Sequence, residues 1–95
     1  MMSNYSFKPS DELTFATVQS DRKRLLDYLQ EHKRESLCLD LSDVKQCDSA
    51  GLALLIEAKR LCRKHNKIFT IEGMPKSIYA LAEFCGVEAM LRANH

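Results

Sequence analysis

A strand, a helix and a second strand follow one another between residues 37 and 71. Leu37–Leu41 (LCLDL) is apolar at nearly every position, which is typical of a strand flanked by helices. Ile68–Ile71 is a second apolar run, and a strand–helix–strand unit connects its strands in parallel through a right-handed crossover. The sequence therefore predicts an α/β fold. The intervening helix is predicted from about Ser49 to before Asn66, with an apolar arc of Leu52, Leu54, Leu55, Ile56, Leu61 and Cys62.

The segment before this unit predicts a hairpin and a helix. Tyr5–Lys8 and Glu12–Thr17 are short β-rich runs joined by the turn residues 9–11, so we expect them to pair as an N-terminal hairpin. Ser20 or Asp21 is predicted to cap a first helix that runs to about Lys33. Its apolar stripe, which needs a sheet to cover, is Leu25, Leu26 and Leu29.

The segment after the unit predicts one more helix and a packed tail. Pro75 suits the first turn of a third helix, and Gly86 suits its end. The tail Val87–Leu91 is apolar enough to pack back on the domain. The buried face of the third helix is predicted to be Ile78, Leu81, Ala82 and Cys85.

Length and composition indicate one small domain, which we take as residues 1–95. The net charge of +1 is too small to attract nucleic acid in general, and the basic run at residues 63–67 is interpreted as a solvated helix end that offsets the helix dipole. No Cys-x-x-Cys pair occurs, so reduced thiols are expected, with Cys38, Cys62 and Cys85 buried. The longest apolar stretch, Ala50–Ile56, is too short to cross a bilayer. We therefore expect a cytoplasmic protein that does not insert into the membrane.

The residue types that carry out catalysis are not grouped along the sequence. The histidines at 32, 65 and 95 lie in polar, helix-terminal or chain-terminal settings, and the three glycines are too far apart for a phosphate-binding loop. Asp40, Asp43 and Asp48 could meet at the carboxyl end of the central strand and bind magnesium, but Asp48 is better explained as a helix cap. We therefore predict no enzyme activity, no bound metal and no cofactor.

Asp48-Ser49-Ala50-Gly51, at the start of the second helix, is the most informative motif. Asp48 or Ser49 can cap the helix, and the hydroxyl of Ser49 can also accept a phosphate, which the unpaired N–H groups and the dipole of the helix end would stabilise. Gly51 costs about 1 kcal/mol of helix stability relative to alanine, so it indicates a packing or docking requirement. We expect Ser49 both to cap the helix and to contact a partner.

The LDLS strand followed by Asp48-Ser49-Ala50-Gly51 resembles the STAS domain family, named for sulfate transporters and anti-sigma-factor antagonists. This resemblance implies a small α/β domain with a mixed sheet covered by helices. Within the family, the MlaB-like domains of ABC phospholipid transporters are most similar in AGLALL and in the later Gly73, Lys76, Tyr79, Leu81 and Ala82. That likeness implies a non-catalytic adaptor that binds an MlaF-like ATPase at the inner face of the inner membrane and helps to maintain outer-membrane lipid asymmetry.

We also predict the residues that bind the partner, of which the resemblance implies Asp48, Ser49 and Ala50. They lie at the start of the second helix and on the exposed side of the third: Asp48, Ser49, Ala50, Ala53, Glu57, Lys76 and Tyr79. MlaB-like domains usually have threonine in the motif, whereas Ser49 matches the phosphorylated serine of anti-sigma-factor antagonists. A partner switch controlled by phosphorylation of Ser49 therefore remains the alternative function.

Overall fold

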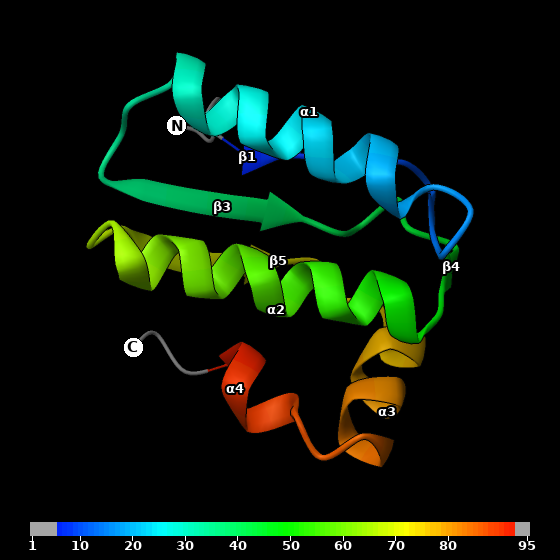
Figure 1. The fold of residues 1–95 in the computed structure, drawn as a ribbon. Helices are drawn as coiled ribbons and strands as arrows, with labels where there is room; N and C mark the ends of the chain where they lie inside the picture. The colour runs from blue at the N-terminus through cyan, green and yellow to red at the C-terminus, as the bar shows by residue number, and fades with distance from the viewer. Residues whose placement is uncertain (1–5, 93–95) are drawn as a thin grey trace.

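The computed structural model describes residues 6–92, and its centre is a three-stranded sheet (Figure 1). Strands β1 (Ser6–Phe7), β3 (Ser36–Asp40) and β5 (Ile68–Glu72) pair side by side in the order β1-β3-β5. Both pairings are parallel, with Leu39 opposite Phe7 on one side and Ile71 on the other. The predicted parallel pairing of the two central strands is confirmed, and each begins and ends within one residue of its predicted range.

The predicted N-terminal hairpin is wrong. Strand β2 (Glu12–Leu13) pairs in parallel with β4 (Gln46–Cys47), while β1 pairs with β3. Between β1 and β2, the amide and the hydroxyl of Ser10 both donate to the carboxylate of Asp21, at 3.1 and 2.6 Å. Tyr5, the first residue of the predicted hairpin, lies outside the described residues.

Helix α1 (Val18–Glu31) begins earlier than predicted, with Thr17 at its N-cap. Asp21, one of the two predicted caps, lies inside the first turn and is only 1% exposed, so the prediction of a cap at Ser20 or Asp21 is wrong. The buried carboxylate is satisfied by Ser10 and by Arg24, whose Nη1 lies 3.0 Å away. Asp21 thus fixes the segment after β1 to the first helix.

Helix α2 (Ser49–Lys64) begins and ends where the sequence predicts, and it lies beside α1 on one face of the sheet (Figure 1). Its buried arc also includes Lys59, which is 6% exposed and whose Nζ donates to the carbonyl of Met90. This bond holds the short helix α4 (Glu88–Arg92) against α2. Helix α3 (Lys76–Phe84) follows Pro75 and crosses below the start of α2 (Figure 1).

The core lies between the sheet and the helices. Leu37, Leu39 and Phe69 are buried toward the helices, while Ile68, at 56% exposure, lies on the other side of its strand. Leu91 is buried, which confirms that the tail packs back. The remaining buried apolar residues are Phe7, Leu13, Leu25, Leu41, Val44, Leu52, Leu54, Leu55, Ala58, Cys62, Ile78 and Ala82.

The predictions for the cysteines are partly wrong. Cys62 is buried, as expected, but Cys38 is half-buried and Cys85 is exposed. Cys38 alternates with Leu37 and Leu39 along β3 and therefore faces away from the helices, while Cys85 follows the last residue of α3 and lies beyond its packed face.

The predicted α/β class is confirmed, as is the covering of the sheet by helices. The resemblance implied a mixed sheet, whereas every strand pairing among residues 6–92 is parallel. Over the same residues, no helix has both the length and the apolar character needed to cross a bilayer.

Candidate partner-docking site

Asp48 organises the start of α2. One carboxylate oxygen accepts hydrogen bonds from the backbone N–H groups of Ala50 and Gly51, at 2.9 and 3.1 Å, which is the geometry of an N-cap. The other oxygen accepts from the backbone N–H of Phe15, 3.0 Å away in the loop between β2 and α1. A single side chain thus caps the helix and fixes the neighbouring loop to it.

These hydrogen bonds favour the ionised form of the carboxyl. The pKa of Asp48 lies below its ordinary value, first because of the N–H of Phe15 and then because of the N–H groups of Gly51 and Ala50. Ser49 is the first residue of the helix rather than its cap, so the prediction that Ser49 caps α2 is wrong. Its side chain is exposed.

Gly51 is required by the packing of the chain on itself. A Cβ atom at this position would lie 2.0 Å from the backbone oxygen of Leu13 in β2. The requirement that Gly51 indicates is therefore one of packing, and the strand that approaches it belongs to the same chain. One side of the helix start is covered by β2, and the opposite side remains available.

The available side is formed by small residues. Ser49 and Ala53 are exposed and Ala50 is half-buried. Ala50 and Ala53 line a shallow groove of about 270 Å³ between α1 and α2, whose other lining residues are Val18, Gln19, Arg22, Leu54 and Glu57. The guanidinium of Arg22 pairs with the carboxylate of Glu57 at 2.8 Å, so Glu57 already has a partner within the chain and closes one part of this groove.

Phe15 is a candidate site residue that the sequence did not predict. It is 79% exposed, although aromatic side chains usually bury much of their surface, and its backbone is held by Asp48 at the start of α2. The sequence predicts a strand over Glu12–Thr17, and aromatic residues are common in strands, so nothing in the sequence marks Phe15 as part of a site. We define the docking face as Phe15, Ser49, Ala50 and Ala53.

The two predicted residues of α3 do not line the groove between α1 and α2. Lys76 is exposed and Tyr79 is half-buried. The next residue after Lys76, Ser77, lines a hollow of about 490 Å³ together with Asp48 and Cys47. Helix α3 therefore begins next to the motif but does not line the groove that contains Ala53 and Glu57.

The three aspartates that could have bound a metal do not act together. Asp40 and Asp43 both approach the Nζ of Lys8, at 3.9 and 2.8 Å, whereas the carboxylate of Asp48 is occupied by backbone N–H groups. Among residues 6–92, no three His, Cys, Asp or Glu side chains are arranged to hold a metal ion.

Burial, followed by the nearby Asp48 charge, raises the pKa of the Cys47 thiol to about 11, which makes it a poor nucleophile at neutral pH.

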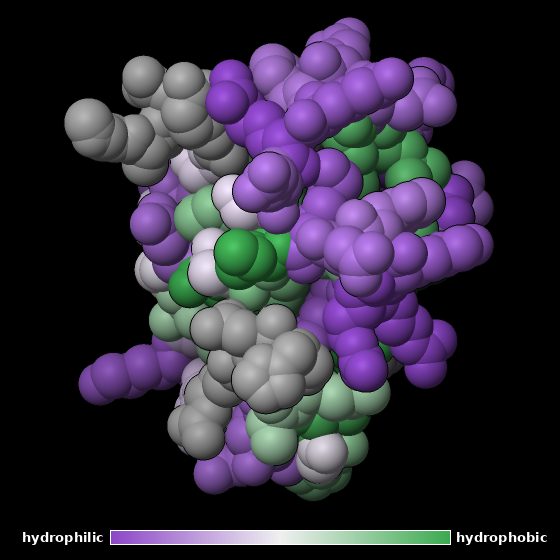
Figure 2. Space-filling view, turned by 90° about the vertical axis from the view of Figure 1, so that its left-hand side faces the viewer, coloured by the Kyte–Doolittle hydropathy of each residue, from purple (hydrophilic) through white to green (hydrophobic). Residues whose placement is uncertain are grey.

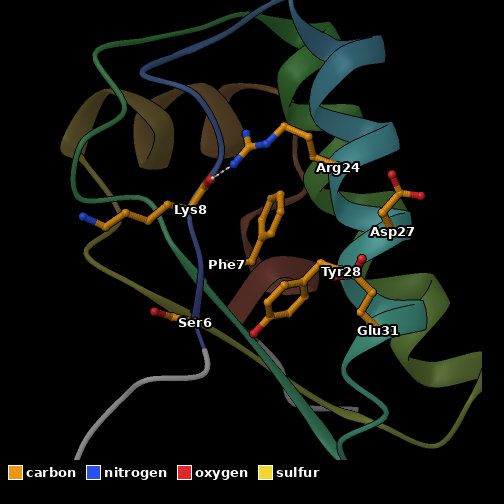
Figure 3. Close-up of a pocket in the computed structure, with 7 residues that line it drawn as sticks. All are labelled: Ser6, Phe7, Lys8, Arg24, Asp27, Tyr28 and Glu31. Carbon is orange, nitrogen blue, oxygen red and sulfur yellow. Dashed lines mark hydrogen bonds between the residues drawn. The ribbon is translucent and has the colours of Figure 1, made fainter.

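A larger hollow of about 540 Å³ lies between β1 and α1 (Figure 3). Arg24 reaches across it, donates to the carbonyl of Lys8 at 3.0 Å and lies 5.1 Å from the centre of the Phe7 ring. This contact occupies a backbone acceptor next to the edge strand. Side chains with acidic and aromatic groups complete the lining, which consists of Ser6, Phe7, Lys8, Arg24, Asp27, Tyr28 and Glu31.

Comparison with known proteins relates the chain to one family. A family model described as "Mlab, STAS domain" matches residues 10–92. Two relatives, from Escherichia coli K12 and Shigella flexneri, are each named "Intermembrane phospholipid transport system binding protein MlaB". Each is 36% identical over 52 residues, which cover 55% of this chain and 54% of the relative. The aligned part thus spans about half the length of these curated relatives.

Proposed function

The chain belongs to the MlaB-type STAS domain family, and from this premise we propose that it is a non-catalytic adaptor of an ABC phospholipid transport system. It binds the MlaF-like ATPase subunit through the docking face. The ATPase holds it in the cytoplasm at the inner face of the inner membrane, and the complex serves to maintain outer-membrane lipid asymmetry. The relatives named for intermembrane phospholipid transport support this proposal.

The observation that carries the proposal is the exposed face around Ser49. Exposed small side chains allow close approach of another backbone, and the exposed ring of Phe15 supplies an aromatic anchor of the kind that is enriched at protein interfaces. Asp48 holds both parts in place through its bonds to Phe15 and to the first turn of α2. The face is therefore fixed before a partner arrives, which lowers the entropic cost of binding.

The other predicted residues have distinct places in this proposal. Asp48 positions the face, and Glu57, paired with Arg22, forms its border along α2. Lys76 and Tyr79 extend the contact onto α3.

Binding to the purified ATPase tests the docking face. Ala53→Arg and Ser49→Arg each place a long charged side chain on the exposed surface, and we expect each to weaken the dissociation constant by at least about 10-fold. Ser36→Arg is the matched control, because Ser36 is also exposed but begins β3, away from this face. Equal binding by all three variants and the wild type would show that the face is assigned wrongly.

The alternative is a partner switch controlled by phosphorylation of Ser49. The exposed hydroxyl at a helix start favours it, because a kinase could reach this residue. The same helix start weighs against local stabilisation of a phosphate, since the N–H groups of Ala50 and Gly51 already bind Asp48 and its carboxylate would repel the new charge. Incubation with a candidate serine kinase, followed by intact-mass analysis of the wild type and Ser49→Ala, distinguishes the two functions.

A further inference from the structure

A second groove lies where α1 and α2 end, and the proposed adaptor function does not use it. It has a volume of about 530 Å³ and separates the last turns of the two helices. Figure 2 faces this end of the molecule and shows hydrophobic surface enclosed between hydrophilic side chains on the side of the two helices. The lining residues are Leu26, Leu29, Gln30, Lys33, Leu61, His65 and Lys67.

The floor of the groove is apolar and incompletely covered. Leu26, Leu29 and Leu61 are each half-buried, so part of each side chain remains in contact with water. Exposed apolar surface gathered in a hollow is a favourable site for another apolar group, since contact between the two removes both surfaces from water. The floor therefore indicates an occupant with an apolar portion.

The rim of the groove is basic. Lys33, His65 and Lys67 line it, and none of the ion pairs found among residues 6–92 includes any of these three. The Nζ of Lys67 donates to the carbonyl of Arg34, which holds this positive charge beside the groove. Within the described part of the chain, no direct ion pair therefore neutralises the positive charge of this rim.

The helix dipoles explain only part of this arrangement. Basic residues in the last turn of α2, Arg63 and Lys64, oppose the negative end of its dipole. Lys33 and Lys67, however, lie beyond the ends of α1 and α2, and the dipole does not account for the apolar floor between them. Along residues 31–35 and 63–67 there are five Lys or Arg residues and two carboxylates, Glu31 and Glu35.

We propose that this groove binds an anionic amphiphile with one alkyl chain, whose tail lies on the leucine floor and whose carboxylate or phosphate head meets the basic rim. Sites for small ligands commonly have volumes of about 300–1,000 Å³, an apolar lining and a few placed polar groups, and they occur between helices. A bilayer surface fits less well because the floor is recessed between two helices. Nucleic acid fits less well because its charged backbone has no apolar group for the floor.

The groove is separate from the docking face. Leu61 lies twelve residues after Ser49 on the same helix, which corresponds to about 18 Å at 1.5 Å per residue. Binding of an amphiphile can therefore be tested with the isolated chain, and its failure would leave the adaptor proposal unaffected.

Amide chemical shifts of the isotope-labelled chain provide the test. The probes are dodecanoate, dodecyl phosphate, dodecyltrimethylammonium and inorganic phosphate, each added below its micelle concentration where it forms micelles. We expect saturable shifts around residues 26–33 and 61–67 with dodecanoate, dodecyl phosphate or both, and the stronger of the two identifies the head group. Binding by the cationic amphiphile with equal affinity, equal binding of inorganic phosphate, or shifts scattered over the chain would each overturn the proposal.

Variants separate the floor from the rim. Lys33→Glu should weaken binding about 3- to 10-fold, because it reverses an exposed charge at the rim. Lys45→Glu makes the same charge change away from the groove and should leave binding unchanged. Leu61→Gln should abolish measurable binding, and its thermal unfolding is measured to verify that it folds. Equal weakening by Lys33→Glu and Lys45→Glu would overturn the proposal, because net charge alone would then explain binding. Binding of anionic vesicles or of an acidic peptide, without binding of the single-chain probes, would also overturn it.

Discussion

Substitution of Gly51 by alanine should destabilise the domain, although alanine is the better helix former. The exchange gains about 1 kcal/mol of helix propensity. The added Cβ, however, would lie 2.0 Å from the backbone oxygen of Leu13, and carbon–oxygen contacts normally lie near 3.3 Å or beyond, so the two elements must separate by more than about 1 Å. Because the clash is with backbone, no side-chain rotation relieves it.

The expected net loss follows from these two effects. Overpacking typically costs about 1–3 kcal/mol, and a rigid backbone contact belongs at the upper end of that range. After subtraction of the propensity gain, Gly51→Ala should lose about 2 kcal/mol of unfolding free energy, which lowers Tm by roughly 8–16 °C in a domain of this size. The separation also disturbs the hydrogen bond from the Asp48 amide to the Leu13 carbonyl, which is 3.3 Å long.

Thermal and urea unfolding followed by circular dichroism measure this effect. Ala53→Gly is the control, because Ala53 is exposed on the same helix and should lose only the propensity difference of about 1 kcal/mol. A Gly51→Ala variant whose Tm equals or exceeds that of the wild type would refute the packing explanation, because propensity alone would then decide the result.

Four further results are expected. The pKa of Asp48 is lowered in the folded chain, so its carboxylate stabilises the fold above the unfolded pKa of about 3.9. This stabilisation is lost as the pH falls through the folded pKa. In urea unfolding between pH 2 and 6, the stability of Asp48→Asn should therefore depend less on pH than that of the wild type. Lys59→Met keeps the apolar part of the side chain but removes the hydrogen bond to the Met90 carbonyl. Amide hydrogen exchange in α4 should therefore accelerate, and unchanged exchange would contradict the assigned contact. Iodoacetamide at pH 8 should label exposed Cys85 well before Cys47, whose pKa is raised to about 11, and equal rates by peptide mass analysis would argue against this difference. Phe15→Ser should weaken binding to the ATPase by at least about 10-fold with little change in Tm, whereas unaltered binding would remove Phe15 from the docking face.

The sequence predicts the centre of this fold because the relevant signals are local. The apolar run at Leu37–Leu41 and the helical spacing after Ser49 depend on neighbouring residues, and both elements form close to their predicted ranges. The N-terminal pairings could not be read in this way, since Phe7 pairs with Leu39 and Leu13 with Cys47. Such pairings are decided by the packing of distant segments.

The same distinction applies to the site. Asp48 is identifiable as a cap from its position before the helix, but its bond to Phe15 joins residues 33 positions apart and is visible only in the structure. Gly51 indicated a packing or docking requirement without indicating that Leu13 lies against it. Asp21 is of a residue type that often caps helices, but its buried carboxylate instead accepts a hydrogen bond from the distant Ser10. Charged residues therefore gave the least reliable predictions where their partners lay far along the chain.

The proposed function depends on contact between the exposed side of the α2 start and the ATPase. Photo-crosslinking of the assembled complex tests it most directly, with a photoreactive phenylalanine derivative placed at position 53 in one sample and at position 36 in another. Both residues are exposed, and only Ala53 belongs to the docking face. We expect a crosslink to the ATPase from position 53 and none from position 36, and the reverse pattern would show that the docking face is assigned wrongly.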